Sequence, residues 1–448
     1  MLDPAVPTPI DLSDFDTYLA TCCGLAQERL GGYASLADLD QDQAEVNRYP
    51  RLEELTEPRQ VRVLDQGLVP AAAETRAGEA LLGGRILLEH TCAGEATRLG
   101  LGTKYLITPP RDLTPEVLAR FPELQPQGWR VKPAELRPLS LGRRHMLQLA
   151  WDIRQLAESA GQDPAAALAR QTLLIIMNEA THNEVREDFR EARFYGFDPS
   201  RVLFMVQRSF PGLTRAQGAW RLAPDSPRRL HNHGQMLMQT TMEGQIFRLD
   251  AAGGRQTLSW PEFQDLCAGF DDKISFNIED MDYLSSSLDL LGLAGALKLG
   301  EEGYRMVMEV VTNDPDNPQK GGALAWDPEL GRDVMIESFQ LKGVANQDIT
   351  HLNRNINHYP RPAEMLTQVR ERGLSMPIAV KQGYLYFQPV QGDVNFLVPT
   401  AFVRRPVVQS IRAWKSAANT PAALEAMAAQ ERRPGFLAWA AGLTGLAL

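Results

Sequence analysis

A loop of small and basic residues follows a short apolar run early in the sequence. Residues 86–88 predict a buried strand, and small residues in the loop after it would let backbone N–H groups approach an anion closely. The small residues are Ala93, Gly94 and Ala96, and the basic residues that would neutralise a polyphosphate are Arg98 and Lys104. The pattern predicts a phosphate-binding loop in a nucleotide-handling protein. A glycine-rich turn with an incidental arginine and lysine is the alternative reading.

The loop matches neither of the two commoner phosphate-loop patterns. It lacks Gly-x-x-x-x-Gly-Lys-Ser/Thr, the pattern of the P-loop NTPases, and it lacks Gly-x-Gly-x-x-Gly in register after the strand. A kinase-like ATPase and a dinucleotide-binding enzyme are therefore disfavoured.

Acidic residues gather after another predicted strand, residues 274–278. They are Glu279, Asp280 and Asp282. Carboxylates at the end of a strand that faces a phosphate loop are suited to hold Mg²⁺ against phosphate oxygens, so the sequence predicts a magnesium site there. The spacing does not say which carboxylate binds the metal, and a solvated acidic turn is the alternative.

Three histidines have spacings that could serve a metal or a proton transfer. His231 and His233 would face the same side of an extended segment, but no third ligand follows at a customary spacing, which disfavours a zinc site. His182 follows Thr181, which forms a helix-start pattern with Glu184 and is the expected N-cap. We expect a structural role for His182 and assign it no proton transfer.

The elements that must position these residues alternate between short apolar runs and helical stretches. Continuous apolar strands separated by helices predict a largely parallel sheet that is covered on both faces. Ligands of such sheets bind at the carboxyl ends of the strands, where the loops should converge. The apolar runs are residues 86–88, 173–177, 202–206 and 274–278, with further strands expected at 305–312 and 333–341 and a helix at 183–193.

Three regions follow from the pattern along the 448 residues. Residues 1–82 are expected to form a helical N-terminal appendage, because their apolar positions have helical spacing. Residues 83–375 should form the α/β core, and residues 376–448 a closing strand with a short helical C-terminal region.

Charge and composition limit the class of partner. The net charge of −10 argues against broad binding to nucleic acid or to anionic membranes. The four cysteines have no Cys-x-x-Cys spacing, and the first residues show no signal-peptide or membrane-spanning pattern. We therefore expect a soluble, cytoplasmic protein with no nucleic-acid partner and no membrane partner.

Several segments match, in order, the motifs of a known group of enzymes. They are Thr91-Cys-Ala-Gly-Glu-Ala-Thr-Arg-Leu-Gly100 with Lys104, Met177-Asn-Glu-Ala-Thr-His182, Phe204-Met-Val-Gln207, His231-Asn-His-Gly-Gln235, Lys320-Gly-Gly-Ala-Leu324, Ile336-Glu337-Ser-Phe-Gln340, Asn355-Ile-Asn-His358 and Met376-Pro-Ile-Ala-Val-Lys381. Over about residues 83–405 the chain resembles the UDP-sugar pyrophosphorylase family, which holds eukaryotic-type UTP-glucose-1-phosphate uridylyltransferases and UDP-N-acetylhexosamine pyrophosphorylases. The resemblance implies a GT-A-like, Rossmann-like nucleotidyltransferase core with a mixed, mostly parallel sheet.

The resemblance also implies roles for individual residues. For the nucleotide these are Cys92, Ala93 and Gly94 in the loop, Gln207 at the uracil edge and Gly234 against the base. An amide such as that of Gln207 supplies the donor and the acceptor that a uracil edge requires, although a glutamine that merely ends a strand is the alternative. The residues implied to neutralise phosphate charge are Arg98, Lys104 and Lys381. The implied metal ligands are Glu279 and Asp280. The residues implied to line the sugar site are His233, Gly322, Glu337, Asn355 and Asn357.

The implied reaction joins a sugar 1-phosphate to UTP, with Mg²⁺ as cofactor, and gives a UDP-sugar and pyrophosphate. The chain departs from the family pattern at Ala93, Ala96, Thr103 and Glu279. These departures motivate a second hypothesis, a regulatory protein that binds sugar nucleotides without turnover. Another nucleoside triphosphate or a cyclitol phosphate is a further alternative within the enzyme class.

Overall fold

The structure is a computed structural model, and it describes residues 3–6, 8, 10–52, 56–95, 100–120, 128–314, 321–341, 343–406, 413–414 and 417–448. Its largest sheet has twelve strands within these ranges. In spatial order ten of them are β1 (Arg62–Val63), β16 (Thr400–Arg404), β10 (Met306–Thr312), β13 (His351–His358), β9 (Asp272–Asn277), β2 (Ile86–Thr91), β3 (Thr172–Asn178), β4 (Val202–Gln207), β7 (Ile246–Leu249) and β8 (Arg255–Thr257), and β11 (Gly322–Asp327) joins β13 and β12 (Arg332–Glu337).

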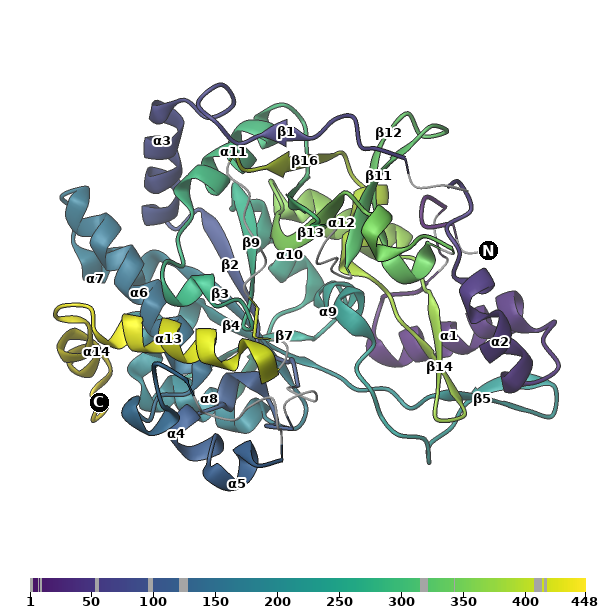
Figure 1. Ribbon diagram of the computed structural model, residues 1–448, viewed down its shortest axis with the longest axis horizontal. Coiled ribbons are helices and arrows are strands. Elements are labelled where there is room, and N and C mark those ends of the chain that lie inside the picture. Colours follow the sequence, from purple (N-terminus) through teal and green to yellow (C-terminus); the bar gives the residue numbers. More distant parts are fainter. Residues whose placement is uncertain are drawn as a thin grey trace.

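Four adjacent strands, β9, β2, β3 and β4, are parallel and form the centre of this sheet. They are the four apolar runs that the sequence predicts as strands, so the expected parallel arrangement is confirmed for the centre. The flanking pairs β13–β9 and β4–β7 are antiparallel, which makes the whole sheet mixed. Figure 1 shows β2, β9, β3 and β4 side by side in the middle of the molecule.

Alternating side chains of the central strands pack into two separate apolar clusters, one on each face of the sheet. Leu88, Ile175 and Phe204 belong to one cluster, and their chain neighbours Leu87 and Ile176 belong to the other. The first face is covered by α3 (Ala71–Leu82), α6 (Leu141–Ser159), α7 (Pro164–Arg170), α8 (His182–Glu191), α11 (Leu290–Glu301), α13 (Thr420–Glu431) and α14 (Phe436–Thr444). The second is covered by α1 (Phe15–Leu30), α9 (Asn232–Thr240), α10 (Trp260–Ala268) and α12 (Pro362–Arg372). The expected two-sided cover is confirmed.

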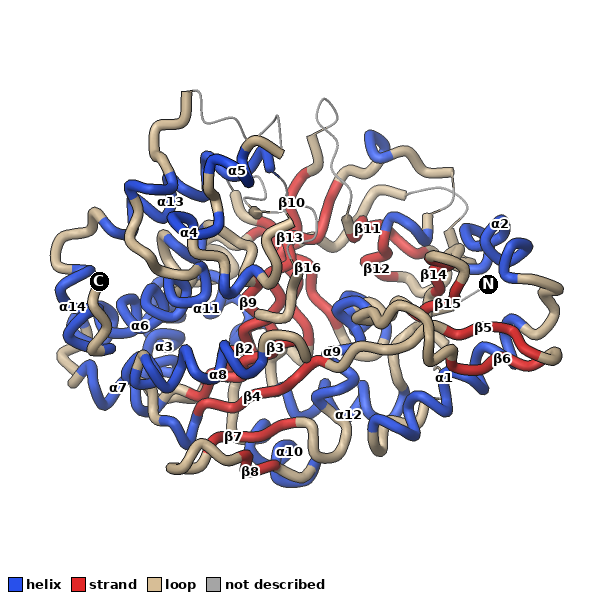
Figure 2. The backbone as a smooth tube through the Cα atoms, turned by 90° about the horizontal axis from the view of Figure 1, so that it is seen from below, coloured by secondary structure: helices blue, strands red, loops and turns tan. Residues whose placement is uncertain are grey.

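A second sheet of four short strands lies apart from the central strands. Its order is β14 (Ile378–Lys381), β15 (Tyr384–Phe387), β5 (Leu213–Ala216) and β6 (Ala219–Leu222). The helix α2 (Leu36–Val46) packs on it, where Asn47 exchanges two hydrogen bonds of 2.8 Å with the backbone of Ile378. Figures 1 and 2 place this sheet and the N-terminal helices at the opposite end of the molecule from α13 and α14.

The structure corrects the sequence expectations at two points. The segment between the strands expected at 305–312 and 333–341 contains β11, which was not predicted, because its apolar run begins at the glycine Gly322. The helix expected at 183–193 is α8, and Thr181 occupies its N-cap position as expected, but the Thr181 side chain makes no capping hydrogen bond. The Thr181 hydroxyl donates to the Asn178 side chain instead, at 2.8 Å.

The N-terminal residues also contain more than helices. β1 pairs with β16 in the main sheet, and α3 contributes Ala73 and Ala77 to the first apolar cluster. The division of the chain into three regions stays a prediction. None of the helices in the described ranges combines the length and the apolar character needed to cross a membrane.

Candidate active site

The central parallel strands end at one edge of the sheet and bring four polar residues to it. Asn277 of β9 is in register with Thr91 of β2, and Asn178 of β3 is in register with Gln207 of β4. The loops that the sequence assigns to a ligand site therefore begin at the same edge, as expected for the carboxyl ends of parallel strands.

The predicted phosphate loop is described at its two ends, Cys92–Glu95 and Gly100–Lys104, whereas Arg98 and Ala96 lie outside the described residues. The two ends are tied together, because the Lys104 N–H donates to the Gly94 carbonyl at 3.0 Å. The buried Asn178 side chain donates to the Ala93 carbonyl at 3.0 Å and to the Thr103 hydroxyl at 3.1 Å. The loop is thus closed at its base and fixed to β3.

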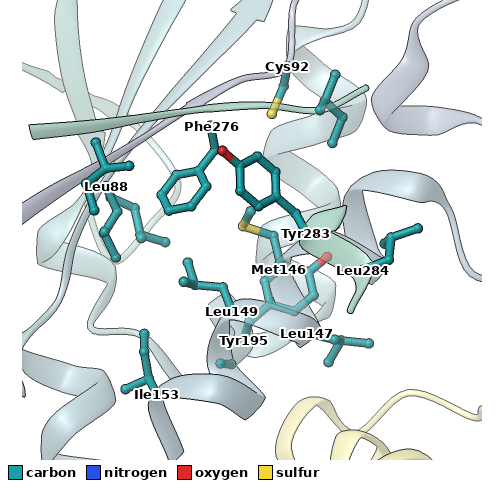
Figure 3. Packing of buried hydrophobic residues seen from close by; sticks show 14 of the residues in the cluster. Leu88, Cys92, Met146, Leu147, Leu149, Ile153, Tyr195, Phe276, Tyr283 and Leu284 are labelled. Atoms are coloured by element: carbon teal, nitrogen blue, oxygen red, sulfur yellow. The ribbon is translucent and has the colours of Figure 1, made fainter. Parts of the chain in front are cut away.

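The three small residues at the start of this loop differ in exposure. Cys92 and Ala93 are buried, and Gly94 is exposed. Figure 3 shows the Cys92 side chain in the same apolar cluster as Phe276 and Tyr283. Burial raises the pKa of the Cys92 thiol, and the Cys92 N–H already donates to the Ile176 carbonyl at 2.8 Å. The contacts of all three residues with a nucleotide stay predictions.

The basic and acidic residues predicted for phosphate and metal meet at this edge. Lys104 and Glu279 form an ion pair whose side chains are 13% and 10% exposed. Asn277 donates to the other Glu279 carboxylate oxygen at 3.4 Å, and the Glu279 carbonyl accepts the Trp414 N–H at 2.8 Å. A lysine and a carboxylate from two different loops are thus held together at the strand ends.

Asp280 carries a perturbed carboxyl group beside this ion pair. Burial is the largest cause that raises the pKa of Asp280, to about 6, and the carboxylates of Asp282 and Glu279 raise it further. The Asp282 N–H and the Arg354 guanidinium act in the opposite direction. Several partly buried carboxylates close together make a cation favourable here.

The predicted base-contacting glutamine is engaged in a side-chain network. Gln207 is 5% exposed and donates to the Asn232 carbonyl at 3.3 Å and to Gln235 Oε1 at 3.2 Å. Gln235 in turn donates to the Arg208 carbonyl at 2.6 Å. Gln207 therefore lies at the expected strand end, and its contact with uracil stays a prediction.

Gly234 has a structural reason to be glycine. A Cβ atom on Gly234 would lie 2.5 Å from the Pro389 carbonyl carbon and 2.6 Å from the Val390 nitrogen, so α9 could not cross that segment. The helical start of α9 also separates the two neighbouring histidines, because His231 is buried and His233 is exposed. The paired-histidine metal reading, which needs an extended segment, does not fit this geometry.

A cleft of about 210 Å³ opens at the same edge. Its lining includes the predicted sugar-site residues His233, Gly322, Glu337 and Asn357, together with Thr91 and Asn277 of the strand ends. Asn357 is 5% exposed, and its Oδ1 atom has no hydrogen-bond partner among the described residues. A buried acceptor without a partner is costly unless a ligand supplies the donor. The Asn355 side chain lies outside the described part of the chain.

Lys381 is not brought to this ion pair by any contact of the described residues. It lies in β14 of the small sheet, where burial lowers its pKa and the Arg229 guanidinium lowers it further. Its predicted contact with substrate phosphates stays a prediction.

A buried ion pair below the cleft was missed from the sequence. Glu89 Oε2 and Lys273 Nζ lie 2.8 Å apart, with side chains 2% and 1% exposed. Ser275, which lines the cleft, donates its hydroxyl to Glu89. The signal in the sequence is a glutamate that directly follows the apolar run 86–88, since a charge in a buried strand needs a partner.

Asp393 is a second buried carboxyl that the sequence did not indicate. Ser375 donates its hydroxyl to Asp393 Oδ2, and Oδ1 has no partner among the described residues. Burial raises the pKa of Asp393 to about 7, the Ser375 hydroxyl lowers it, and the Glu337 carboxylate raises it.

We expect Asp393→Asn to stabilise the protein at high pH and to flatten its stability profile. The folded chain binds the Asp393 proton more tightly than the unfolded chain. The protonated Asp393 therefore contributes stability that is fully present below the ordinary pKa of 3.8 and is lost as the pH rises to about 7. The free energy of unfolding is measured with urea at about pH 4 and about pH 8. Relative to the wild type, that of the variant should be higher at pH 8 than at pH 4 by on the order of 1 to 4 kcal/mol. A difference that is the same at both pH values would contradict the burial of an ionisable group at this position.

The fold is similar to those of solved UDP-sugar pyrophosphorylases. The uridine diphosphate N-acetylglucosamine pyrophosphorylase of Trypanosoma brucei, solved with an inhibitor, has 16% identity and a TM-score of 0.60, over 91% of this chain and 78% of that one. A mutant UDP-glucose pyrophosphorylase of Leishmania major, solved with UDP-glucose, has 12% identity and a TM-score of 0.54, over 90% and 78%. A putative UDP-N-acetylglucosamine pyrophosphorylase of Entamoeba histolytica has 15% identity and a TM-score of 0.51, over 80% and 83%.

No protein-family model matches the chain, and no curated protein matches its sequence. The similarity to the solved structures confirms the resemblance inferred from the motifs at the level of the fold. The chain has the α/β fold of the UDP-sugar pyrophosphorylases, with a large mixed sheet whose central strands are parallel.

Proposed function

We propose that this chain is a nucleotidyltransferase with a GT-A-like core that joins a sugar 1-phosphate to UTP and releases pyrophosphate. The observation that carries the proposal is the ion pair of Lys104 with Glu279 at the carboxyl edge, next to the cleft lined by Glu337 and Asn357. Asn277 links the two parts, because it donates to Glu279 and also lines the cleft. The shared fold with solved UDP-sugar pyrophosphorylases supports the same class of reaction.

In the proposed reaction an oxygen of the sugar phosphate attacks the α-phosphorus of UTP. A bond forms between these two atoms, the bond from the α-phosphorus to the bridging oxygen breaks, and pyrophosphate leaves with the electron pair. The attacking oxygen is already anionic near neutral pH, so no general base is required. Alignment and charge neutralisation remain, and Lys104, with Arg98 and Lys381, would supply the positive charge.

The cleft is suited to a ligand rich in hydroxyl groups. The Glu337 carboxylate and the Asn357 Oδ1 atom are acceptors for sugar hydroxyls, with His233, Gly322 and Asn355 as further proposed contacts. Gln207 and Gly234 are the proposed base contacts.

Glu279 and Asp280 are the proposed ligands of Mg²⁺. The raised pKa of Asp280 reflects a partly buried group of carboxylates, which a cation would relieve, so the residues fit the ion. Bound there, Mg²⁺ would neutralise charge on phosphate oxygens. In the described ranges no group of three His, Cys, Asp or Glu side chains is arranged to hold a metal alone. Mg²⁺ is usually held by one or two carboxylates together with waters and substrate phosphates, so two carboxylates are enough for the proposed site.

The test is release of pyrophosphate from UTP. The purified chain is incubated with Mg²⁺, UTP and a panel of sugar 1-phosphates that includes N-acetylhexosamine 1-phosphates and a cyclitol phosphate. We expect release that requires one acceptor, falls with ATP or GTP in place of UTP, and stops on chelation of Mg²⁺. Binding of UTP or a UDP-sugar without any release across the panel would favour the regulatory alternative.

A further inference from the structure

Tyr105 follows Lys104 directly in the chain and is fully buried. The two residues begin the short 3-10 helix Lys104–Leu106, and Tyr105 is 0% exposed. The Tyr105 hydroxyl donates to Asp188 Oδ2 at 2.8 Å. The residue next to Lys104 is thus attached to α8.

The Tyr105 ring is held as tightly as its hydroxyl. A Cβ atom on Gly142 would lie 2.3 Å from two carbons of the ring, so the ring rests directly on the backbone of α6. The Leu141 N–H also donates to the Ile107 carbonyl at 2.8 Å. Because only glycine allows this approach, the ring has no room to shift toward α6.

Asp188 is itself fixed by partners on both carboxylate oxygens. Arg143 pairs with Oδ1, and the Tyr195 hydroxyl donates to Oδ2, beside that of Tyr105. Tyr195 is the third of four consecutive residues with positive φ, at 50°, 51°, 53° and 79° for residues 193 to 196. Side chains disfavour this conformation, so the surrounding packing must maintain it. The acceptor that holds Tyr105 is therefore rigid.

We infer that Tyr105 is a positioning residue for Lys104. The side of Lys104 toward Thr103 is fixed by Asn178, and the side toward Tyr105 is fixed by Asp188. A lysine side chain has many rotamers, and a fixed backbone on both sides limits the positions that its ammonium can reach, among them the position of the ion pair with Glu279. The inference rests on the proposed function only in the claim that Lys104 meets substrate phosphate; the position of Lys104 is a claim about this chain alone.

The test compares Tyr105→Phe with Tyr49→Phe. Tyr49 is a matched control, because it is also 0% exposed and donates its hydroxyl to a buried aspartate, Asp327, at 2.5 Å, in a different apolar cluster. Both variants keep the ring and lose one hydroxyl, so both should lower the thermal midpoint by similar amounts.

Two readouts separate positioning from stability. A brief pulse of acetic anhydride followed by mass spectrometry should label Lys104 severalfold more in Tyr105→Phe than in the wild type, with no change in Tyr49→Phe. In the pyrophosphate assay Tyr105→Phe should lower kcat about tenfold with little change in KM, because a misplaced charge fails mainly in the transition state.

Equal Lys104 labelling and equal kcat in the two variants would overturn the positioning role. A wild-type protein that releases no pyrophosphate would refute the proposed function. The labelling comparison would still decide whether Tyr105 positions Lys104.

Discussion

Replacing Lys104 by alanine is expected to lower kcat for pyrophosphate release by about 100- to 1,000-fold, with a smaller change in KM for either substrate. The ammonium of Lys104 lies at the carboxyl edge, with a side chain only 13% exposed, where charge is poorly screened by water. The negative charge that it would meet grows toward the transition state, so its loss should affect turnover more than binding. Steady-state kinetics with UTP and the preferred sugar 1-phosphate measure both constants.

Two further variants make this result specific. Lys132 is an exposed lysine distant in sequence from the loop, and Lys132→Ala should leave kcat unchanged. Lys104→Arg keeps the positive charge and should retain part of the activity. The recovery should be incomplete because a planar guanidinium group has a different shape and hydrogen-bond geometry from an ammonium group. Since Lys104→Ala leaves Glu279 without its ion-pair partner, a thermal unfolding curve must show that the variant is folded. A folded Lys104→Ala variant with wild-type kcat would remove Lys104 from the proposed chemistry.

Replacing Glu89 by glutamine is expected to lower the free energy of unfolding by about 3 to 5 kcal/mol. Glu89 and Lys273 are almost inaccessible to water, and the Lys273 ammonium also lies 4.5 Å above the centre of the Tyr359 ring. Without the carboxylate, the ammonium would remain charged in an apolar interior or give up its proton, and either outcome is unfavourable. Urea unfolding of the two proteins at neutral pH measures the difference.

A double variant and a surface control show whether the effect of Glu89→Gln comes from the buried charge. Glu89→Met combined with Lys273→Met removes both charges, so it should lose much less stability than Glu89→Gln alone. Glu45→Gln breaks the pair with Arg48, whose side chains are 43% and 31% exposed, and it should cost less than about 1 kcal/mol. If Glu89→Gln were no more destabilising than Glu45→Gln, the Glu89 carboxylate would not carry a buried charge in the folded protein.

The central strands were predictable because each is an uninterrupted apolar run. The runs at 86–88, 173–177, 202–206 and 274–278 coincide with β2, β3, β4 and β9. A strand buried on both faces must be apolar at successive positions, so its sequence signal is strong and local. β11 was missed although residues 323–326 are apolar, since glycine and alanine are depleted in strands and make its signal weak.

Part of the candidate site followed from the same reasoning. Parallel strands present their carboxyl ends at one edge, so a phosphate loop after β2 and an acidic turn after β9 were expected at the same edge, and the structure makes the two strands neighbours. The Lys104–Glu279 ion pair agrees with this expectation. The use of Gly234 did not follow, because it depends on Pro389 and Val390, which are distant in sequence. The contact of the Thr181 hydroxyl with Thr103 did not follow for the same reason.

Local sequence patterns were thus sufficient for the central strands, for the edge at which a ligand site would form and for the residue types available there. Local sequence patterns did not predict which partner each polar group would have. Glu89 of β2 and Lys273 of β9 are 184 residues apart in the sequence, and Tyr105, whose ring rests on α6, reaches Asp188 of α8. Spacing along a chain encodes periodicity, whereas burial and pairing arise only when distant segments pack together, and these set the electrostatics of the site.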